Sequence, residues 1–324
     1  MGYKLAGFDV IGCNEIDPRM NKVYVANHHP RLNYLCDIRE MVTKELPDEL
    51  YHLDVLDGSP PCSSFSTAGL RTKEWGKEKK FREGQVSQVL DTLFFDFIAL
   101  AKRLQPKVVI AENVKGLIVG QAMEYVRKIY DEFDAAGYAL CHTLLDASKM
   151  GVPQIRERVF FTAIRKDLLK YIPRTAHLFE EIPNIDLNFN EPPLTMRDFA
   201  DFKGKHLGEG TKNYQIWEAR IESDHDMGDT SRRLFGTPFG FTQHYIKLDD
   251  VCLTLAASND NSLIHYEQPV RLSDMEAVNI STFPQDYDFG KEKPHYICGM
   301  SVPPVMMAQV ASRVYDQWLS KIPK

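Results

Sequence analysis

Residues 8–165 alternate between runs typical of β-strands and segments with the periodicity of amphipathic helices. The strand-like runs are 8–14, 53–56, 107–111, 138–145 and 158–164, and the helix-like segments begin at Asp17-Pro18 and cover 85–104 and 121–136. This alternation predicts an α/β fold with a doubly wound, mostly parallel sheet. Ligands of such sheets bind beyond the carboxyl ends of the strands, so the residues that follow each strand are the first candidates for a functional site.

The character of the sequence changes at about residue 166. Residues 166–268 hold many aromatic residues, prolines and glycines with little periodicity, and regular patterns return at 270–282 and in a final helix at 303–320. We therefore expect one domain made of residues 1–165 and 269–324, and a second, smaller domain made of residues 166–268.

The composition narrows the classes of protein. No apolar run approaches the roughly 18 residues that a membrane span needs, so we expect no membrane partner. The six cysteines are scattered, without a CxxC pair, which argues against a metal site or a disulfide framework and favours the cytoplasm. The net charge of −6 lowers the expectation of a nucleic-acid partner, although it does not exclude a local basic surface.

Three polar motifs fall at predicted strand ends. They are Pro60-Pro61-Cys62, then Glu112-Asn113-Val114, then Gln154-Ile155-Arg156-Glu157-Arg158. Each has an ordinary structural explanation: a free cysteine is often a small buried apolar residue, and charged residues at strand ends are often solvated or form weak surface ion pairs. Taken singly, none of them identifies a function.

In this order, the three motifs resemble those of the C5-cytosine DNA methyltransferases. The resemblance extends to the segment 92–96, to Arg271-Leu272-Ser273 with Glu276, and to Gly299-Met300-Ser301-Val302, and it covers nearly the whole chain. It implies that residues 1–165 and 269–324 form a class I, Rossmann-like catalytic domain that binds S-adenosylmethionine. Residues 166–268 would then be the target-recognition domain that binds DNA.

The resemblance also assigns catalytic roles. Cys62 would add as a thiolate to C6 of cytosine, which makes C5 nucleophilic enough to accept a methyl group. Glu112 would bind N3 and the exocyclic amine, and it must be protonated when it donates to N3, which requires a buried site that raises its pKa. Arg158 would contact O2 of the base, and Arg156 would support the pocket or a phosphate.

The cofactor residues implied by the resemblance follow the first predicted strands. Glu15 would accept hydrogen bonds from the ribose hydroxyls, and Ile16 would contact the adenine. The other residues of this group are Asp37 and Ile38 at the adenine amine and edge, Leu93 on the adenine face, and Pro61 and Ser301.

A cytosine within a duplex must be flipped out before these groups can reach it. The segment 67–84 contains several cations, among them Arg71 and Lys73, and we interpret it as a loop that closes over the DNA and contacts phosphates. A solvated surface loop is the alternative for this segment. Thr254 matches a family residue that contacts the DNA backbone.

The chain departs from the family pattern at two places. Its first residues resemble the helix that follows the family's first strand and glycine-rich turn, so we expect that strand and turn to be missing from the sequence given. Met300 stands where the family usually has asparagine, which removes a polar contact to the cofactor.

The function that the resemblance implies is DNA cytosine-5 methylation of duplex DNA in a restriction–modification or phage-protection setting, with a cognate restriction endonuclease as a candidate partner. Two alternatives stay open. One is the same chemistry on tRNA, and the other is a truncated, inactive remnant that binds DNA.

Overall fold

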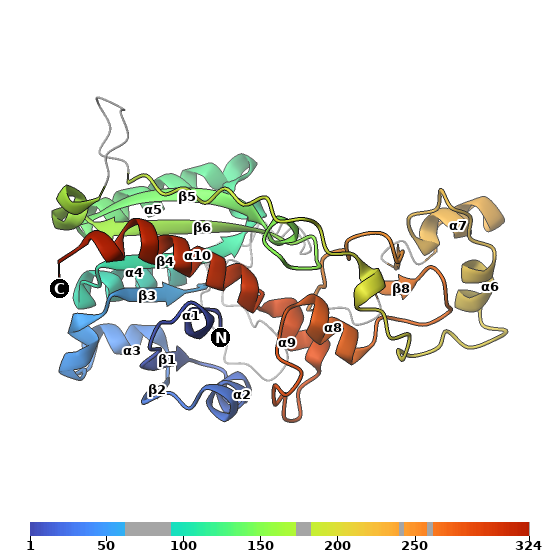
Figure 1. Cartoon of the computed structure of the whole chain (residues 1–324), viewed down its shortest axis with the longest axis horizontal. Coiled ribbons are helices and arrows are strands. Elements are labelled where there is room, and N and C mark those ends of the chain that lie inside the picture. Colours follow the sequence, from blue (N-terminus) through green and yellow to red (C-terminus); the bar gives the residue numbers. More distant parts are fainter. Residues whose placement is uncertain (62–91, 173–182, 240–242, 258–261, 324) are drawn as a thin grey trace. The chain divides into compact units, whose positions relative to one another are not determined.

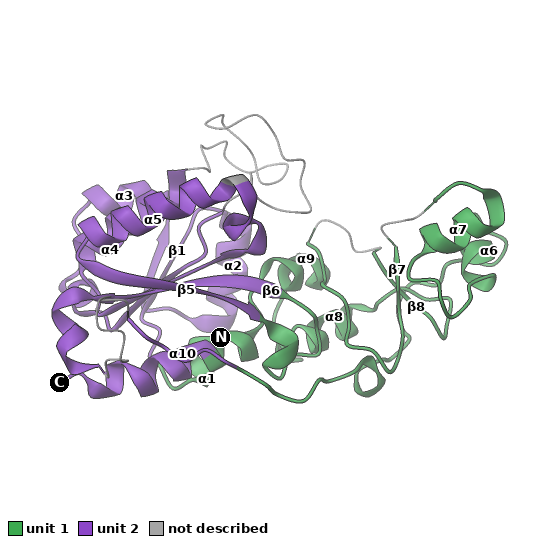
Figure 2. Ribbon diagram, turned by 90° about the horizontal axis from the view of Figure 1, so that it is seen from above, with its two compact units in different colours: residues 1–8, 146–156, 189–309 green, residues 9–145, 157–188, 310–324 purple. Residues whose placement is uncertain are grey.

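The computed structural model describes residues 1–61, 92–172, 183–239, 243–257 and 262–323, and these residues form two compact units (Figure 2). Unit 1 contains residues 1–8, 146–156 and 189–309. Unit 2 contains residues 9–145, 157–188 and 310–324. The two units are defined by the structure alone. The catalytic and target-recognition domains of the sequence analysis are functional assignments, and they stay a prediction.

Unit 2 has the predicted α/β architecture, with its described strands in two sheets (Figure 1). The first sheet pairs β1 (Gly12–Glu15) with β2 (Leu32–Leu35) in parallel. The second has the order β3-β4-β6-β5, formed by β3 (Val55–Gly58), β4 (Val108–Val114), β6 (Glu157–Arg165) and β5 (Tyr138–Asp146). Strands β3 and β4 are parallel, and β6 runs antiparallel to β4.

The strands separate into two sheets between β1 and β3. Within the described part of the chain, β1 pairs only with β2, and β3 pairs only with β4.

Unit 2 contains four complete α-helices and part of a fifth among its described residues. They are α2 (Pro18–His28), α3 (Ile38–Thr43), α4 (Leu93–Leu104), α5 (Met123–Ala135) and the end of α10 (Pro304–Gln317). Asp17 accepts a hydrogen bond from the Arg19 amide and Pro18 takes the first helical position, which confirms the predicted start of α2. Helix α4 ends at Leu104, and the next residue, Gln105, caps it in a left-handed conformation.

The main core of unit 2 lies between α4, α5 and the strands β4 and β6. Phe94 of α4 contacts Phe161 of β6 edge-to-face, with 5.5 Å between ring centroids. Residues 108–113 of β4 are all buried, as expected of a strand that is covered on both faces. The polar side chains of Glu112 and Asn113 are therefore held in a rigid element.

Unit 1 is richer in loops, as the sequence pattern predicted for much of residues 166–268. Its helices and strands are α1 (Gly2–Leu5), α6 (Lys212–Glu218), α7 (Met227–Phe235), α8 (Asp274–Ile280), α9 (Pro294–Met300), the start of α10, and the parallel pair β7 (His244–Ile246) and β8 (Leu263–His265).

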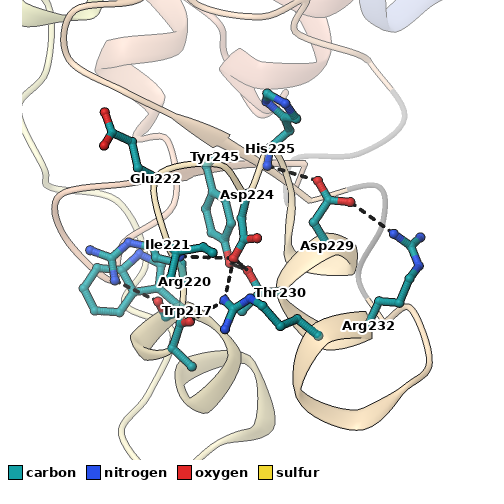
Figure 3. A network of polar contacts seen from close by, with 12 residues as sticks. Trp217, Arg220, Ile221, Glu222, Asp224, His225, Asp229, Thr230, Arg232 and Tyr245 are labelled. Atoms are coloured by element: carbon teal, nitrogen blue, oxygen red, sulfur yellow. Dashed lines mark hydrogen bonds and ion pairs between the residues drawn. The ribbon is translucent and has the colours of Figure 1, made fainter.

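A buried carboxylate holds the loop before α7 in place (Figure 3). Asp224, which is 5% exposed, accepts hydrogen bonds from the Ile221 amide at 3.1 Å and from Thr230 Oγ1 at 2.8 Å. Arg233 of α7 forms an ion pair with the same carboxylate at 2.7 Å. A buried charge needs several such donors, so the loop is fixed to α7 by its own polar groups.

The resemblance motif Ser273-x-x-Glu276 has a structural explanation in unit 1. Ser273 accepts from the Glu276 amide and Glu276 accepts from the Ser273 amide, which is the capping box that starts α8. Glu276 Oε1 also lies 3.0 Å from His265 Nε2 of β8 and accepts the Asp201 amide at 2.7 Å. The motif therefore fastens α8 to its neighbours.

Candidate active site

The end of β3 packs closely against α4 because Gly58 has no side chain. A Cβ atom at this position would lie 2.5 Å from the ring of Phe97, so only glycine allows this approach. Gly58 is also in register with Ala111 of the parallel strand β4. The turn that leads to Pro60 and Pro61 therefore starts beside the residue that precedes Glu112.

Asn113 ties this turn to β4. Its Nδ2 donates a hydrogen bond to the carbonyl oxygen of Pro60 at 3.0 Å, and its Oδ1 accepts the Val114 amide at 2.9 Å. Asn113 is 5% exposed and Pro60 is buried. A buried amide with both polar ends satisfied fixes the position of the chain just before Cys62.

Replacing Asn113 with aspartate tests this tether. The substitution keeps the acceptor for Val114 but replaces the donor to Pro60 with an oxygen that faces the Pro60 carbonyl. We expect unfolding in urea to show a loss of about 1–3 kcal/mol of stability, the cost of a buried polar group that loses its partner.

The control for this substitution is Asn27→Asp, which removes a hydrogen bond of the same kind. In the wild type, the side-chain amide of Asn27 donates this bond to the Val23 carbonyl within α2. Equal effects of the two substitutions would show that the Asn113 tether has no special importance.

Glu112 and Arg158 form the central ion pair of the site. Arg158 Nε lies 2.8 Å from Glu112 Oε1, and their side chains are only 15% and 11% exposed. In the antiparallel pair β4–β6, Glu112 is opposite Phe160 and Val114 is opposite Arg158. The two charged residues are therefore diagonal neighbours on one face of the sheet, as a register of this kind requires. They present a carboxylate and a guanidinium side by side.

A second ion pair lies next along the same ladder. Lys115 Nζ is 2.8 Å from both carboxylate oxygens of Glu157, and its hydrogen bonds connect the end of β4 to the start of β6. The two side chains are 46% and 40% exposed, so water screens this pair, and we expect it to contribute little to stability.

The predicted cofactor carboxylates follow neighbouring parallel strands. Glu15 ends β1 in register with Leu35, and Asp37 follows β2 as the cap of α3. Burial raises the pKa of Glu15. Its Oε1 accepts the Asp17 amide at 2.8 Å, and among the described residues no cation forms an ion pair with it.

Asp37 is more fully engaged by the protein. It accepts the Arg39 amide at 2.9 Å and pairs with the Arg39 guanidinium at 3.3 Å. Arg39 also lies 2.9 Å from Asp96 of α4, so it connects α3 with α4. Ile16 and Ile38, which follow the two carboxylates in sequence, are half-buried.

The remaining predicted cofactor residues have different environments. Leu93 begins α4 and is 6% exposed, and Pro61 is half-buried. Ser301 belongs to unit 1, where it ends α9 and donates to the Ile297 carbonyl at 2.7 Å.

Arg156 and Thr254 also belong to unit 1. Arg156 is 1% exposed and donates to the backbone carbonyls of Leu255 and Gly299. Thr254 is exposed, and its hydroxyl donates to the Ile155 carbonyl.

Three predicted site residues, Cys62, Arg71 and Lys73, lie outside the described residues. In the part of the chain that the structure does describe, no group of three His, Cys, Asp or Glu side chains could hold a metal ion. No described helix is both long enough and apolar enough to cross a bilayer.

Two residues with clear positioning contacts were not among the predicted site residues. Asn113 holds Pro60, and Gln154 accepts the Leu255 amide at 3.3 Å. Both lie in motifs that the sequence singles out. Their position in those motifs was the only available signal, because the partner of a side-chain amide depends on which distant segments meet.

Comparisons with known proteins show the family of this chain. A family model described as C-5 cytosine-specific DNA methylase matches residues 1–316. The chain therefore belongs to the C-5 cytosine-specific DNA methylase family, and it is a DNA (cytosine-5)-methyltransferase by that membership.

Individual relatives match over most of their length. The chain is 28% identical to the type II methyltransferase M.FnuDI of Fusobacterium nucleatum, over 99% of this chain and 92% of that one. It is 32% identical to M.DdeI of Desulfomicrobium norvegicum, over 97% and 85%. Among solved structures, a DNMT2 variant of Spodoptera frugiperda has a TM-score of 0.64 at 16% identity, covering 97% of this chain and 95% of that one. This structural likeness shows that the two share a fold.

Proposed function

We propose that this chain transfers a methyl group from S-adenosylmethionine to C5 of a cytosine flipped out of duplex DNA. The observation that carries the proposal is the buried Glu112–Arg158 pair beside a turn that Asn113 fixes just before Cys62. A nucleophile that follows this turn would start close to a carboxylate and a guanidinium, which are the groups that a pyrimidine edge requires.

Cys62 supplies the nucleophile in this proposal. Its thiolate forms a bond to C6 of the ring, and the ring electrons move toward N3 as C5 becomes nucleophilic. Methyl transfer to C5 would leave S-adenosylhomocysteine as the other product. A base then removes the C5 proton, the electrons of that bond restore the C5–C6 double bond, and the C6–S bond breaks to release the thiolate.

Glu112 and Arg158 hold the opposite edge of the ring. Glu112 would bind the exocyclic amine and deliver a proton to N3 as negative charge develops there, and Arg158 would donate to O2. The 2.8 Å contact between them supports the positioning part of this assignment, because it holds both side chains together before the base enters.

Contacts with the DNA backbone would come from several cations and hydroxyls. We assign phosphate contacts to Arg71 and Lys73, which precede three further lysines in the segment 67–84, and to the exposed Thr254. Such contacts position a duplex without reading its sequence.

The donor and acceptor set fits S-adenosylmethionine. Glu15 is an acidic acceptor without a cation partner among the described residues, and a carboxylate at the end of a parallel strand can accept from both ribose hydroxyls. Asp37 would accept the adenine amine between the half-buried Ile16 and Ile38. Leu93, Pro61 and Ser301 complete the proposed set. The bound cofactor supplies an electrophilic methyl group.

On acidification, cofactor binding should weaken at a higher pH than it would if Glu15 had the pKa of an ordinary glutamate. Burial raises the pKa of Glu15 above its usual 4.5, so on acidification the carboxylate is protonated at a higher pH and loses acceptor capacity sooner. Calorimetry with S-adenosylhomocysteine between pH 8 and 5 should show affinity falling in the wild type. Glu15→Gln should bind more weakly at pH 8 and show a flat profile. Parallel profiles for the two proteins would contradict the role of Glu15.

The biological role that we propose is protection of DNA in a restriction–modification system or a phage, with a cognate endonuclease as partner in the first case. This role is supported by two relatives that are named type II methyltransferases. A cytoplasmic location follows from that role and from the scattered cysteines.

The test is transfer of a labelled methyl group to mixed genomic DNA and, separately, to tRNA. We expect label in DNA as 5-methylcytosine and none in tRNA. Label in tRNA alone would favour the RNA alternative, which the type II relatives support less. Absence of label in both, with no affinity for S-adenosylhomocysteine, would favour the inactive remnant.

A further inference from the structure

The segment 154–156, just before β6, is bonded to residues 252–255 within unit 1. Gln154 forms an isolated parallel bridge with Cys252, and the Ile155 amide donates to the Cys252 carbonyl at 2.8 Å. The Thr254 hydroxyl donates back to the Ile155 carbonyl. Thr254, the proposed DNA contact, is thus held by this segment rather than by a helix or sheet of its own.

Arg156 extends this connection to α9. Its Nη1 donates to the Leu255 carbonyl at 3.2 Å, and its Nη2 donates to the Gly299 carbonyl at 2.9 Å. The residue is 1% exposed, so these bonds are shielded from water. Gly299 lies two residues before Ser301, the proposed cofactor contact. One planar guanidinium therefore joins the residue after Thr254 to the helix that ends at Ser301.

Two further contacts make this junction rigid. Gln154 accepts the Leu255 amide at 3.3 Å and donates to Ser281 Oγ at 3.3 Å, so it fixes the same segment to the end of α8. A Cβ atom at Gly299 would lie 2.6 Å from the Ala257 amide nitrogen. Helix α9 thus packs directly on the backbone of residues 256–257, at a distance that leaves no room for a side chain.

We propose that Arg156 is a positioning residue that makes DNA binding at Thr254 and cofactor binding at Ser301 depend on each other. This inference rests on the proposed function. A shift of either carbonyl strains its bond to the same rigid fork, so a ligand that fixes one segment also fixes the other. A lysine at this position would keep the positive charge, but it has no planar guanidinium. It therefore cannot donate to both carbonyls in this geometry.

The test is the affinity for a labelled duplex that the wild type methylates, measured by anisotropy with and without S-adenosylhomocysteine. In the wild type, S-adenosylhomocysteine should tighten DNA binding at least about 5-fold, the lower end of usual coupling between sites. In Arg156→Lys, the ratio of the two affinities should fall to about 1. The ratio compares each protein with itself, so a general loss of DNA affinity does not change it.

Arg103→Lys is the matched control, because Arg103 donates to the Met41 carbonyl at 2.7 Å in unit 2. It should keep the wild-type ratio. If Arg156→Lys fails to fold, hydrogen exchange in the wild type gives the answer: S-adenosylhomocysteine alone should slow exchange of the Leu255 amide.

Three results would overturn the inference: a folded Arg156→Lys with the wild-type ratio, a wild-type ratio of 1, or a Leu255 amide that the ligand does not protect. All three leave methyl transfer itself intact, because the duplex is one that the wild type methylates. Failure of the proposed function would instead appear as a wild type that methylates no DNA.

Discussion

Cys62→Ala is expected to lose methyl transfer to DNA by at least about 10⁴-fold, since removal of a covalent nucleophile has effects of this order or larger. The physical reason is that C5 of cytosine is a poor nucleophile until a thiolate has added to C6. The measurement is labelled methyl incorporation, together with trapping on DNA that contains 5-fluorocytosine. Wild type should form a covalent adduct with this DNA, and Cys62→Ala should form none.

The matched control for this experiment is Cys141→Ala. Cys141 lies in β5, and burial raises the pKa of its thiol to about 12, so it is protonated and unreactive at neutral pH. Methyl transfer and adduct formation should both survive this substitution. Adduct formation by Cys62→Ala would show that another group is the nucleophile.

Glu112→Gln should lower the single-turnover rate of methyl transfer by about 10²–10⁴-fold, the usual contribution of a general acid. The carboxamide can still accept the hydrogen bond from Arg158 at 2.8 Å, so the fold and the affinity for DNA should change little. What is lost is the acid that protonates N3 as charge develops in the ring. Measuring DNA affinity beside the rate separates this chemical effect from a binding effect.

Glu157→Gln is the comparison for that variant. It removes a carboxylate from the neighbouring pair with Lys115, which is half-exposed. Because water screens this pair, the rate should stay within about threefold of the wild type. If Glu112→Gln were equally mild, Glu112 would not be the acid.

Much of the fold could be predicted from periodicity. The alternation of strand and helix patterns predicted an α/β fold with a mostly parallel sheet, and the caps at Asp17 and Pro18 predicted the start of α2. Boundaries were less accurate: the predicted strand at 8–14 is β1 at Gly12–Glu15, because only four residues of it face β2 in register. Which residues face a partner depends on tertiary pairing, not on local pattern.

The candidate site could be predicted in its residue types but not in its contacts. The order of motifs identified Glu112 and Arg158, and the structure brings them within 2.8 Å of each other. The hydrogen bond from Asn113 to Pro60 could not be predicted, and neither could the burial of Arg156 with its hydrogen bond to the Leu255 carbonyl. Each of these bonds joins segments more than 50 residues apart. A pattern along the chain contains no information about such partners.

The separation of the strands at β1 and β3 has a consequence for the energetics of the cofactor site. Within the described residues, β1 and β2 are four-residue strands that pair only with each other, so they have few backbone bonds to resist local opening. Glu15, the proposed ribose contact, thus sits on this less supported pair of strands, whereas Glu112 sits on β4, which is bonded to a strand on both sides. A ligand that bridges these two regions would stiffen the weaker one, and the protein would gain most of its rigidity there only when it is loaded.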